Sequence, residues 1–148
     1  MHQLKYEGWS RAAEALALAM RHLEPLTAGV SLLPIPLGTR RLRTRGYNQS
    51  ERIATALGAL TGAPVRCNVL RRVRETPTQT ALTPEARHAN VAEAFRAADV
   101  TGVDVVLVDD VFTTGATLAS AGAALAAAGA GRIEAVTFAR ASQELAHD

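Results

Sequence analysis

The chain has 148 residues, of which 48% are apolar and 20% charged, so it can bury the core of one domain and is too apolar for a disordered chain. No stretch approaches the ~18 consecutive apolar residues of a membrane span, and the first residues lack the apolar segment of a signal peptide. The single cysteine, Cys67, excludes an internal disulfide and a multi-cysteine zinc site. We therefore expect a soluble, cytoplasmic protein with one domain over residues 1–148.

The net charge of +2 is unevenly distributed along the chain. Residues 1–95 hold 13 Lys+Arg against 7 Asp+Glu, whereas residues 96–148 hold 3 against 7. Nine arginines fall within residues 40–74, beside the single acid Glu51. This asymmetry predicts an anionic partner for the first half, either a phosphate ester or a nucleic acid.

The N-terminal segment, residues 1–29, contains the first predicted element. Apolar residues at helical spacing predict a helix over residues 10–23. The apolar run 30–33 predicts a buried strand whose exit is fixed by two prolines. We expect a basic loop over residues 37–46.

The middle of the chain predicts one helix and one strand. Asn48 is expected to cap a helix that continues to about Leu60. Residues 65–73 predict a strand, in which Cys67 is expected to be a small buried side chain. A polar loop and a segment of ambiguous structure follow.

The last third has the clearest pattern. Residues 103–108 form a continuous apolar run that is typical of a parallel strand covered on both faces. We expect a turn over 109–115, a helix of small residues over 116–128 and a further strand over 133–138. The alternation of helices and strands predicts an α/β domain with a parallel sheet.

Two adjacent acids, Asp109 and Asp110, follow the strand 103–108. Ligands of open α/β sheets bind outside the carboxyl ends of the strands. Carboxylates accept several hydrogen bonds, which suits a pair of vicinal hydroxyls. We therefore expect these two acids to bind a ribose.

A loop rich in hydroxyl groups connects the acids to the next helix. Its backbone N–H groups lie at the positive end of that helix, an arrangement that binds phosphate. The residues of the loop are Thr113, Thr114, Gly115, Ala116 and Thr117. Together, acids and loop predict a site for a ribose with a 5-phosphate.

Two other phosphate-binding folds are excluded by their motifs. A P-loop NTPase needs G-x-x-x-x-G-K-[ST], and the chain has no Gly-Lys pair. A dinucleotide-binding fold needs G-x-G-x-x-G after its first strand, and the glycines at 122, 129 and 131 lack this spacing. The structural alternative is a buried strand, a turn and a capped helix without a ligand.

Residues 106–117 resemble the phosphoribosyl pyrophosphate (PRPP) loop of type I phosphoribosyltransferases. That pattern is an apolar run, two acids, an apolar residue, any residue, two hydroxyl residues, glycine, any residue and a hydroxyl residue. The chain matches it at every position. The motif implies a ribose-phosphate site and does not identify the acceptor.

Further segments are similar to the ComF family of competence-associated, phosphoribosyltransferase-like proteins. They are Leu4 to Gly8, Pro34 to Pro36, Arg45 to Gln49, Thr76 to Gln79, Arg87 to Val91, and Phe95. Many ComF-like proteins begin with a cysteine-rich, zinc-binding segment, and this sequence starts where that segment would end. The resemblance therefore implies a short form or a start codon assigned too far downstream.

The resemblance implies a type I phosphoribosyltransferase core, with a central, mostly parallel sheet flanked by helices on both faces. Such an enzyme displaces pyrophosphate from C1 of PRPP, and Mg²⁺ is carried by the substrate with no direct protein ligand assigned. By analogy, Asp109 and Asp110 hold the ribose as catalytic residues, and residues 113–117 bind the 5-phosphate. Residues 74–90 correspond to a mobile loop, to which Arg87 brings a positive charge.

The resemblance also implies a pyrophosphate contact in the basic segment. Arg45 is the first candidate, because it precedes the helix that Asn48 caps and because arginine binds phosphate through a planar fork. Arg41 and Arg43 are further candidates. We also expect a homodimer.

Three functions remain open from the sequence. The first is a PRPP-dependent transferase with an unknown acceptor. The second is a protein that binds PRPP or a nucleotide without turnover, as a regulator. The third is a role in DNA uptake and natural transformation, through single-stranded DNA or DNA-uptake proteins, although aromatic residues for base stacking make up only 4% of the chain.

Overall fold

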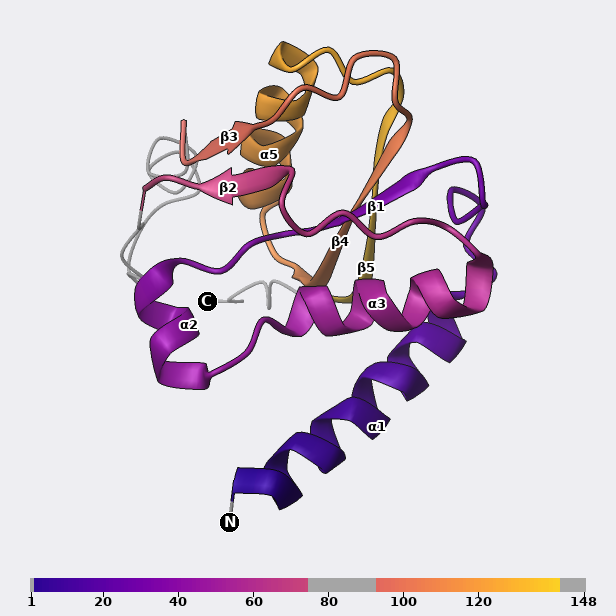
Figure 1. Cartoon of the computed structure of the whole chain (residues 1–148), viewed down its shortest axis with the longest axis vertical. Coiled ribbons are helices and arrows are strands. Elements are labelled where there is room, and N and C mark those ends of the chain that lie inside the picture. The colour runs from indigo at the N-terminus through magenta and orange to yellow at the C-terminus, as the bar shows by residue number, and fades with distance from the viewer. Residues whose placement is uncertain (1, 75–92, 142–148) are drawn as a thin grey trace, which may run out of the picture.

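The computed structural model in Figure 1 describes residues 2–74 and 93–141, and their side chains from Arg11 onward. Arg87 and nearly all of the expected mobile loop, residues 74–90, therefore lie outside the described residues. None of the helices within the described ranges combines the length and apolar composition needed to cross a bilayer.

A parallel sheet forms the centre of the described structure. Its strands are β1 (Ser31–Pro34), β4 (Val105–Phe112) and β5 (Ile133–Arg140), in the order β1-β4-β5. Both pairings are parallel, and Val105 lies opposite Ser31 on one side and Ile133 on the other. The sheet follows from the apolar run at the start of β4, whose first four residues are all buried.

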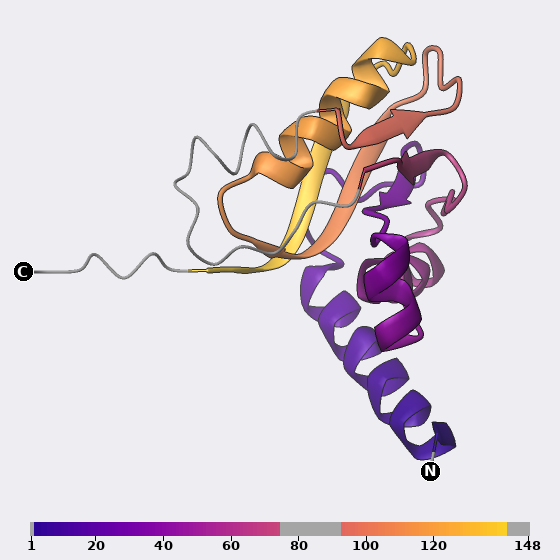
Figure 2. The same ribbon diagram turned by 90° about the vertical axis from the view of Figure 1, so that its left-hand side faces the viewer.

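Helices cover both faces of this sheet, as expected. The helices α1 (His2–Met20) and α3 (Gln49–Thr61) lie on one face, where Val106 and Val108 join their apolar side chains in one core cluster. The helix α5 (Ala116–Ala127) covers the other face, where it packs on Val105 and Leu107 (Figure 2). Side chains of β4 thus alternate between two cores.

An antiparallel pair extends the second core. It consists of β2 (Leu70–Arg72) and β3 (Phe95–Ala97), and Phe95 is almost completely buried beside α5. The predicted strand 65–73 is therefore wrong in extent. Val65 makes only an isolated parallel bridge to Leu32, after which the chain turns away and pairs with β3. Cys67 lies in that turn and is exposed, so the expectation of a buried strand residue is also wrong.

The expected basic loop contains a short helix, α2 (Thr39–Arg45). It buries no residue, so its sequence has no apolar periodicity from which a helix could be predicted. It ends at Gly46, which has a left-handed backbone (φ 79°) and donates its N–H to the Leu42 carbonyl at 2.7 Å.

The predicted Asn48 cap is confirmed. The Asn48 side chain accepts a hydrogen bond from the Ser50 N–H at 3.1 Å and donates one from Nδ2 to the Ile35 carbonyl at 3.0 Å. The first bond begins α3, and the second ties it to the chain just beyond β1. The N-terminus of α3 is thereby held at the carboxyl end of the sheet.

Candidate functional site

Apart from Arg87, which lies outside the described residues, the predicted site residues lie at and beyond the carboxyl ends of two neighbouring parallel strands. The segment after β1 leads into α2, and the segment after β4 leads into α5 (Figure 1). The expected turn over 109–115 begins later than predicted, because β4 continues to Phe112 and pairs with β5 as far as Arg140. The two acids are therefore the fifth and sixth residues of a strand.

Asp109 is held by two hydrogen bonds to the same carboxylate oxygen. The Ser50 hydroxyl of α3 donates to Oδ1 at 2.8 Å, and the backbone N–H of Asp110 donates to Oδ1 at 3.0 Å. Neither bond uses Oδ2. Ser50 is only 4% exposed, so the donor is fixed in the core while Asp109 itself is half-buried.

The environment of Asp109 disfavours its charge. Burial raises the pKa of Asp109 from 3.8 to about 6, and the neighbouring charge of Asp110 acts in the same direction. The hydrogen bonds from Ser50 and from the Asp110 N–H oppose this rise. The carboxyl is mostly ionised at neutral pH, and its pKa lies in the range in which a group can exchange a proton with a ligand.

The loop between β4 and α5 is shaped by a threonine hydroxyl and a glycine. The Thr114 hydroxyl accepts a hydrogen bond from the Ala116 N–H at 3.4 Å, just where α5 begins. Gly115 has a φ of 79°, and a Cβ at this position would lie 3.0 Å from the Phe112 ring. The loop therefore requires glycine both for its backbone conformation and for the space beside Phe112.

The predicted pyrophosphate contacts lie on a separate element. Arg41, Arg43 and Arg45 are exposed on α2, and the last two lie in its final turn. The structure thus brings the acid pair and residues 113–117 together in one strand–loop–helix segment. The arginines follow the neighbouring strand β1.

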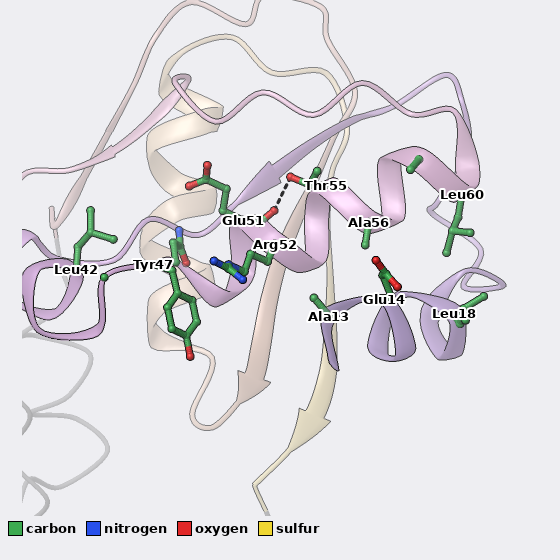
Figure 3. A pocket seen from close by; sticks show the side chains of 13 residues that line it. Ala13, Glu14, Leu18, Leu42, Tyr47, Glu51, Arg52, Thr55, Ala56 and Leu60 are labelled. Atoms are coloured by element: carbon green, nitrogen blue, oxygen red, sulfur yellow. Dashed lines mark hydrogen bonds between the residues drawn. The ribbon is translucent and has the colours of Figure 1, made fainter. Parts of the chain in front are cut away.

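A groove of about 850 Å³ lies along α3 and is also lined by residues of α1 and α2. Figure 3 shows Tyr47 and Arg52 at one end and Leu18 and Leu60 at the other. The Arg52 guanidinium carbon lies 4.7 Å from the centre of the Tyr47 ring, a cation–π contact. Of the predicted site residues that the structure describes, none lines this groove.

Two residues of the site were missed in the sequence. Ser50 is the polar member of a buried row that continues with Ile53, Ala54 and Leu57, and this helical spacing is the signal that could have shown an inward-facing hydroxyl. Phe112 occupies a position where the PRPP-loop pattern accepts any residue, so the pattern carries no signal for its contact with the loop.

Comparison with known proteins identifies the family. A family model described as the phosphoribosyl transferase domain matches residues 43–148. A crystal structure of TT1426 from Thermus thermophilus shares the fold, with a TM-score of 0.50 and 17% sequence identity over 94% of this chain and 86% of that one.

Similar proteins carry names that refer to DNA utilization or to competence. The DNA utilization protein YhgH of Salmonella typhi is 37% identical over 127 residues, which cover 80% of this chain and 56% of that protein. Competence protein F of Haemophilus influenzae is 35% identical over 72% of this chain and 49% of that protein. Competence protein ComFC of Bacillus subtilis is 33% identical over 59% of this chain and 34% of that protein.

The chain spans about half the length, or less, of these curated relatives. The family model nevertheless covers most of the chain, including α3, β4, α5 and the loop at 113–117. The family match, together with the parallel sheet and these relatives, shows that the chain belongs to the phosphoribosyl transferase domain family, as a member of its ComF group.

Proposed function

We propose that the chain binds PRPP and transfers its phosphoribosyl group to an acceptor with release of pyrophosphate. The observation that carries this proposal is the acid pair near the carboxyl end of β4, followed two residues later by the loop of residues 113–117. One ligand, a ribose with a 5-phosphate, satisfies both parts. The family assignment supports the same reading.

The acids and the loop have different tasks in this reaction. Asp109 and Asp110 accept hydrogen bonds from the 2- and 3-hydroxyls of the ribose, and their negative charge favours the positive charge that develops on the ring. The N–H groups and hydroxyls of residues 113–117 hold the 5-phosphate. The bond from C1 to the pyrophosphate oxygen breaks, the electron pair leaves with pyrophosphate, and the acceptor forms the new bond to C1.

The leaving group needs positive charge. Arg45, with Arg41 and Arg43, supplies it from α2, since arginine binds phosphate oxygens through a planar fork. Mg²⁺ bound with the substrate would act as a Lewis acid on the leaving pyrophosphate, and in this proposal it takes its ligands from substrate oxygens. The described residues contain no group of three or more His, Cys, Asp or Glu side chains close enough to hold a metal.

Titration calorimetry of PRPP with Mg²⁺ into the purified protein tests the binding step. We expect saturable binding that is lost in the double variant Asp109→Asn/Asp110→Asn while the circular dichroism spectrum is unchanged. Asp99→Asn, an exposed acid-to-amide exchange near β3, is the matched control and should bind normally. Full affinity in the double variant would refute the site assignment.

Release of pyrophosphate in the presence of candidate bases and amines tests the transfer step. Turnover with one of them, absent in the double variant, supports a transferase. Tight binding of PRPP without pyrophosphate release for any acceptor would favour the non-catalytic regulator that binds PRPP or a nucleotide.

Contact with single-stranded DNA is a second candidate function. It is favoured by the exposed arginines on α2 and by the names of the relatives, which refer to DNA utilization and competence. Fluorescence anisotropy with an oligonucleotide at increasing salt tests it, because each neutralised phosphate adds about −0.7 to the slope of log affinity against log salt. We expect a steep slope that becomes shallower in Arg43→Ala/Arg45→Ala, and weak binding with a flat slope would count against the idea.

A further inference from the structure

A buried hydroxyl from a distant part of the chain reaches the first acid of the site. Ser50, at the beginning of α3, is 4% exposed, and its Oγ donates to Asp109 Oδ1 at 2.8 Å across 59 residues of sequence. A hydroxyl in this position has lost its contact with water, so the hydrogen bond to Asp109 is the one that satisfies its proton. The contact therefore joins the helix on one face of the sheet to the carboxyl end of β4.

We propose that Ser50 is a positioning residue for Asp109: its hydroxyl holds Oδ1 in place, so that Oδ2 is the oxygen offered to the ribose hydroxyls. This inference rests on the proposed PRPP site. Ser50 does not itself touch the ligand in this arrangement and acts through Asp109.

The donor is well suited to this task because it is itself held in place. The Ser50 N–H donates to the Asn48 side chain, and Asn48 donates to the Ile35 carbonyl just beyond β1. Ser50 thus stands on a helix end that is tied to the sheet. Together with the Asp110 N–H, it gives Asp109 Oδ1 two donors from different elements, α3 and β4, which restricts rotation of the carboxylate before any ligand arrives.

The same hydrogen bond supports the ionised form of Asp109. The charge that acts on Asp109 is that of Asp110 on the same strand, whereas α3 offers the neutral hydroxyl of Ser50 and β5 offers the uncharged Thr137 opposite it. Burial and Asp110 raise the pKa of Asp109 to about 6, and the Ser50 hydroxyl limits the rise. Without Ser50, the carboxyl takes up a proton at a higher pH, and Oδ1 keeps only the Asp110 N–H as a donor, so a neutral and less firmly held group is offered to the ribose.

Ser50→Ala tests the proposal, because it removes the hydroxyl and leaves a good helix former in a small buried position. Thr55→Ala is the matched control: it also removes a hydroxyl from α3, but Thr55 is exposed and donates to the Glu51 carbonyl. Each protein is titrated by NMR through the side-chain carboxyl carbon of Asp109. Calorimetry then measures the affinity for PRPP with Mg²⁺ from pH 6 to pH 8.5.

We expect the pKa of Asp109 to be higher in Ser50→Ala than in the wild-type and Thr55→Ala proteins. The affinity for PRPP should fall roughly tenfold at pH 7, as expected for the loss of one hydrogen bond to a charged group, and should recover in part at pH 8.5. A merely structural role for Ser50 would weaken binding equally at every pH and would leave the titration of Asp109 unchanged.

The outcomes separate the two proposals. Identical titration of Asp109 and identical PRPP affinity in the wild-type and Ser50→Ala proteins overturn the role of Ser50 and leave the proposed function standing. Failure of the wild-type protein to bind PRPP at any pH overturns the proposed function, and the role of Ser50 in it, whatever the titration of Asp109 shows.

Discussion

Exchanging Asp109 for asparagine replaces a half-buried carboxyl by an amide of nearly the same shape. The amide oxygen can still accept hydrogen bonds from the Ser50 hydroxyl and the Asp110 N–H, so the packing at this end of β4 is retained. The negative charge beside Asp110 is lost. We therefore expect Asp109→Asn to lose affinity for PRPP and, at neutral pH, to unfold at a higher temperature than the wild-type protein.

The expected gain in stability follows from the pKa of Asp109. Burial raises it from 3.8 to about 6 in the folded chain, whereas exposure to water returns it to its ordinary value in the unfolded chain. Between these two pH values the folded chain binds more protons than the unfolded chain, so the free energy of unfolding falls as the pH rises. A difference of about two pH units corresponds to a cost of about 3 kcal/mol above pH 6. Asparagine does not ionise, so Asp109→Asn can raise the free energy of unfolding by at most this cost.

Thermal unfolding at pH 8 and at pH 3 measures the effect. We expect the free energy of unfolding of Asp109→Asn to exceed that of the wild-type protein by about 1–3 kcal/mol at pH 8. Each kcal/mol raises the melting temperature by roughly 2–4 °C for a chain of this size. At pH 3 the carboxyl is protonated in both folded and unfolded chains, so the variant should lose its advantage over the wild-type protein.

Asp99→Asn provides a control of opposite sign. Hydrogen bonds from the Thr101 hydroxyl and N–H lower the pKa of the exposed Asp99, so its charge is favourable in the folded chain. Its removal should not raise the melting temperature at pH 8. If Asp109→Asn is no more stable than the wild-type protein at pH 8, or is equally stabilised at pH 3, then burial of this charge is not the cause and the reasoning is refuted.

Four further predictions concern the loop at 113–117, the Asn48 cap, the arginines of α2 and the oligomeric state. Gly115→Ala should lower the free energy of unfolding by about 1–3 kcal/mol, as measured by thermal unfolding. The loss should exceed that of Gly102→Ala, because both glycines have positive φ but only Gly115 faces the Phe112 ring. Equal losses of stability in the two variants would show that the ring contact contributes nothing. Asn48→Ala should cost about 1 kcal/mol or more in urea unfolding, through the lost cap and the lost bond to the chain beyond β1, and an unchanged midpoint would contradict this. Arg45→Ala should weaken the calorimetric binding of PRPP and pyrophosphate and leave that of ribose 5-phosphate unchanged; parallel loss of all three would remove the pyrophosphate assignment. Light scattering should give twice the chain mass of 15.6 kDa, and a monomer would contradict the expected homodimer.

Local patterns were sufficient for the elements of the site that are continuous in sequence. The apolar run at 103–108, the acids after it and the loop at 113–117 lie within fifteen residues, and the parallel strand and the helix that follow from them are confirmed. The Asn48 cap was predicted for the same reason, because its main bond is to Ser50, two residues away. Each of these features depends on neighbours along the chain.

Features without a local pattern were missed or assigned wrongly. The helix α2 buries no side chain, so no apolar spacing marks it. The strand β4 continues through both acids to Phe112 because β5 is present to pair with it, and Cys67 is exposed because the chain leaves the sheet after Val65. Pairing partners far away in sequence decide the extent of β4 and the exposure of Cys67.

The sequence by itself predicted the residue types of the candidate site: two acids, a hydroxyl-rich loop with one glycine, and arginines beyond an earlier strand. Only the tertiary structure decided how Asp109 is held, because its hydroxyl partner, Ser50, comes from a helix 59 residues earlier. The register of β1 beside β4 and the Asn48 bond to the Ile35 carbonyl place that helix end against the acid. At this junction the hydrogen bond from Ser50 holds the carboxylate and burial raises its pKa, and no short segment of the sequence encodes either effect.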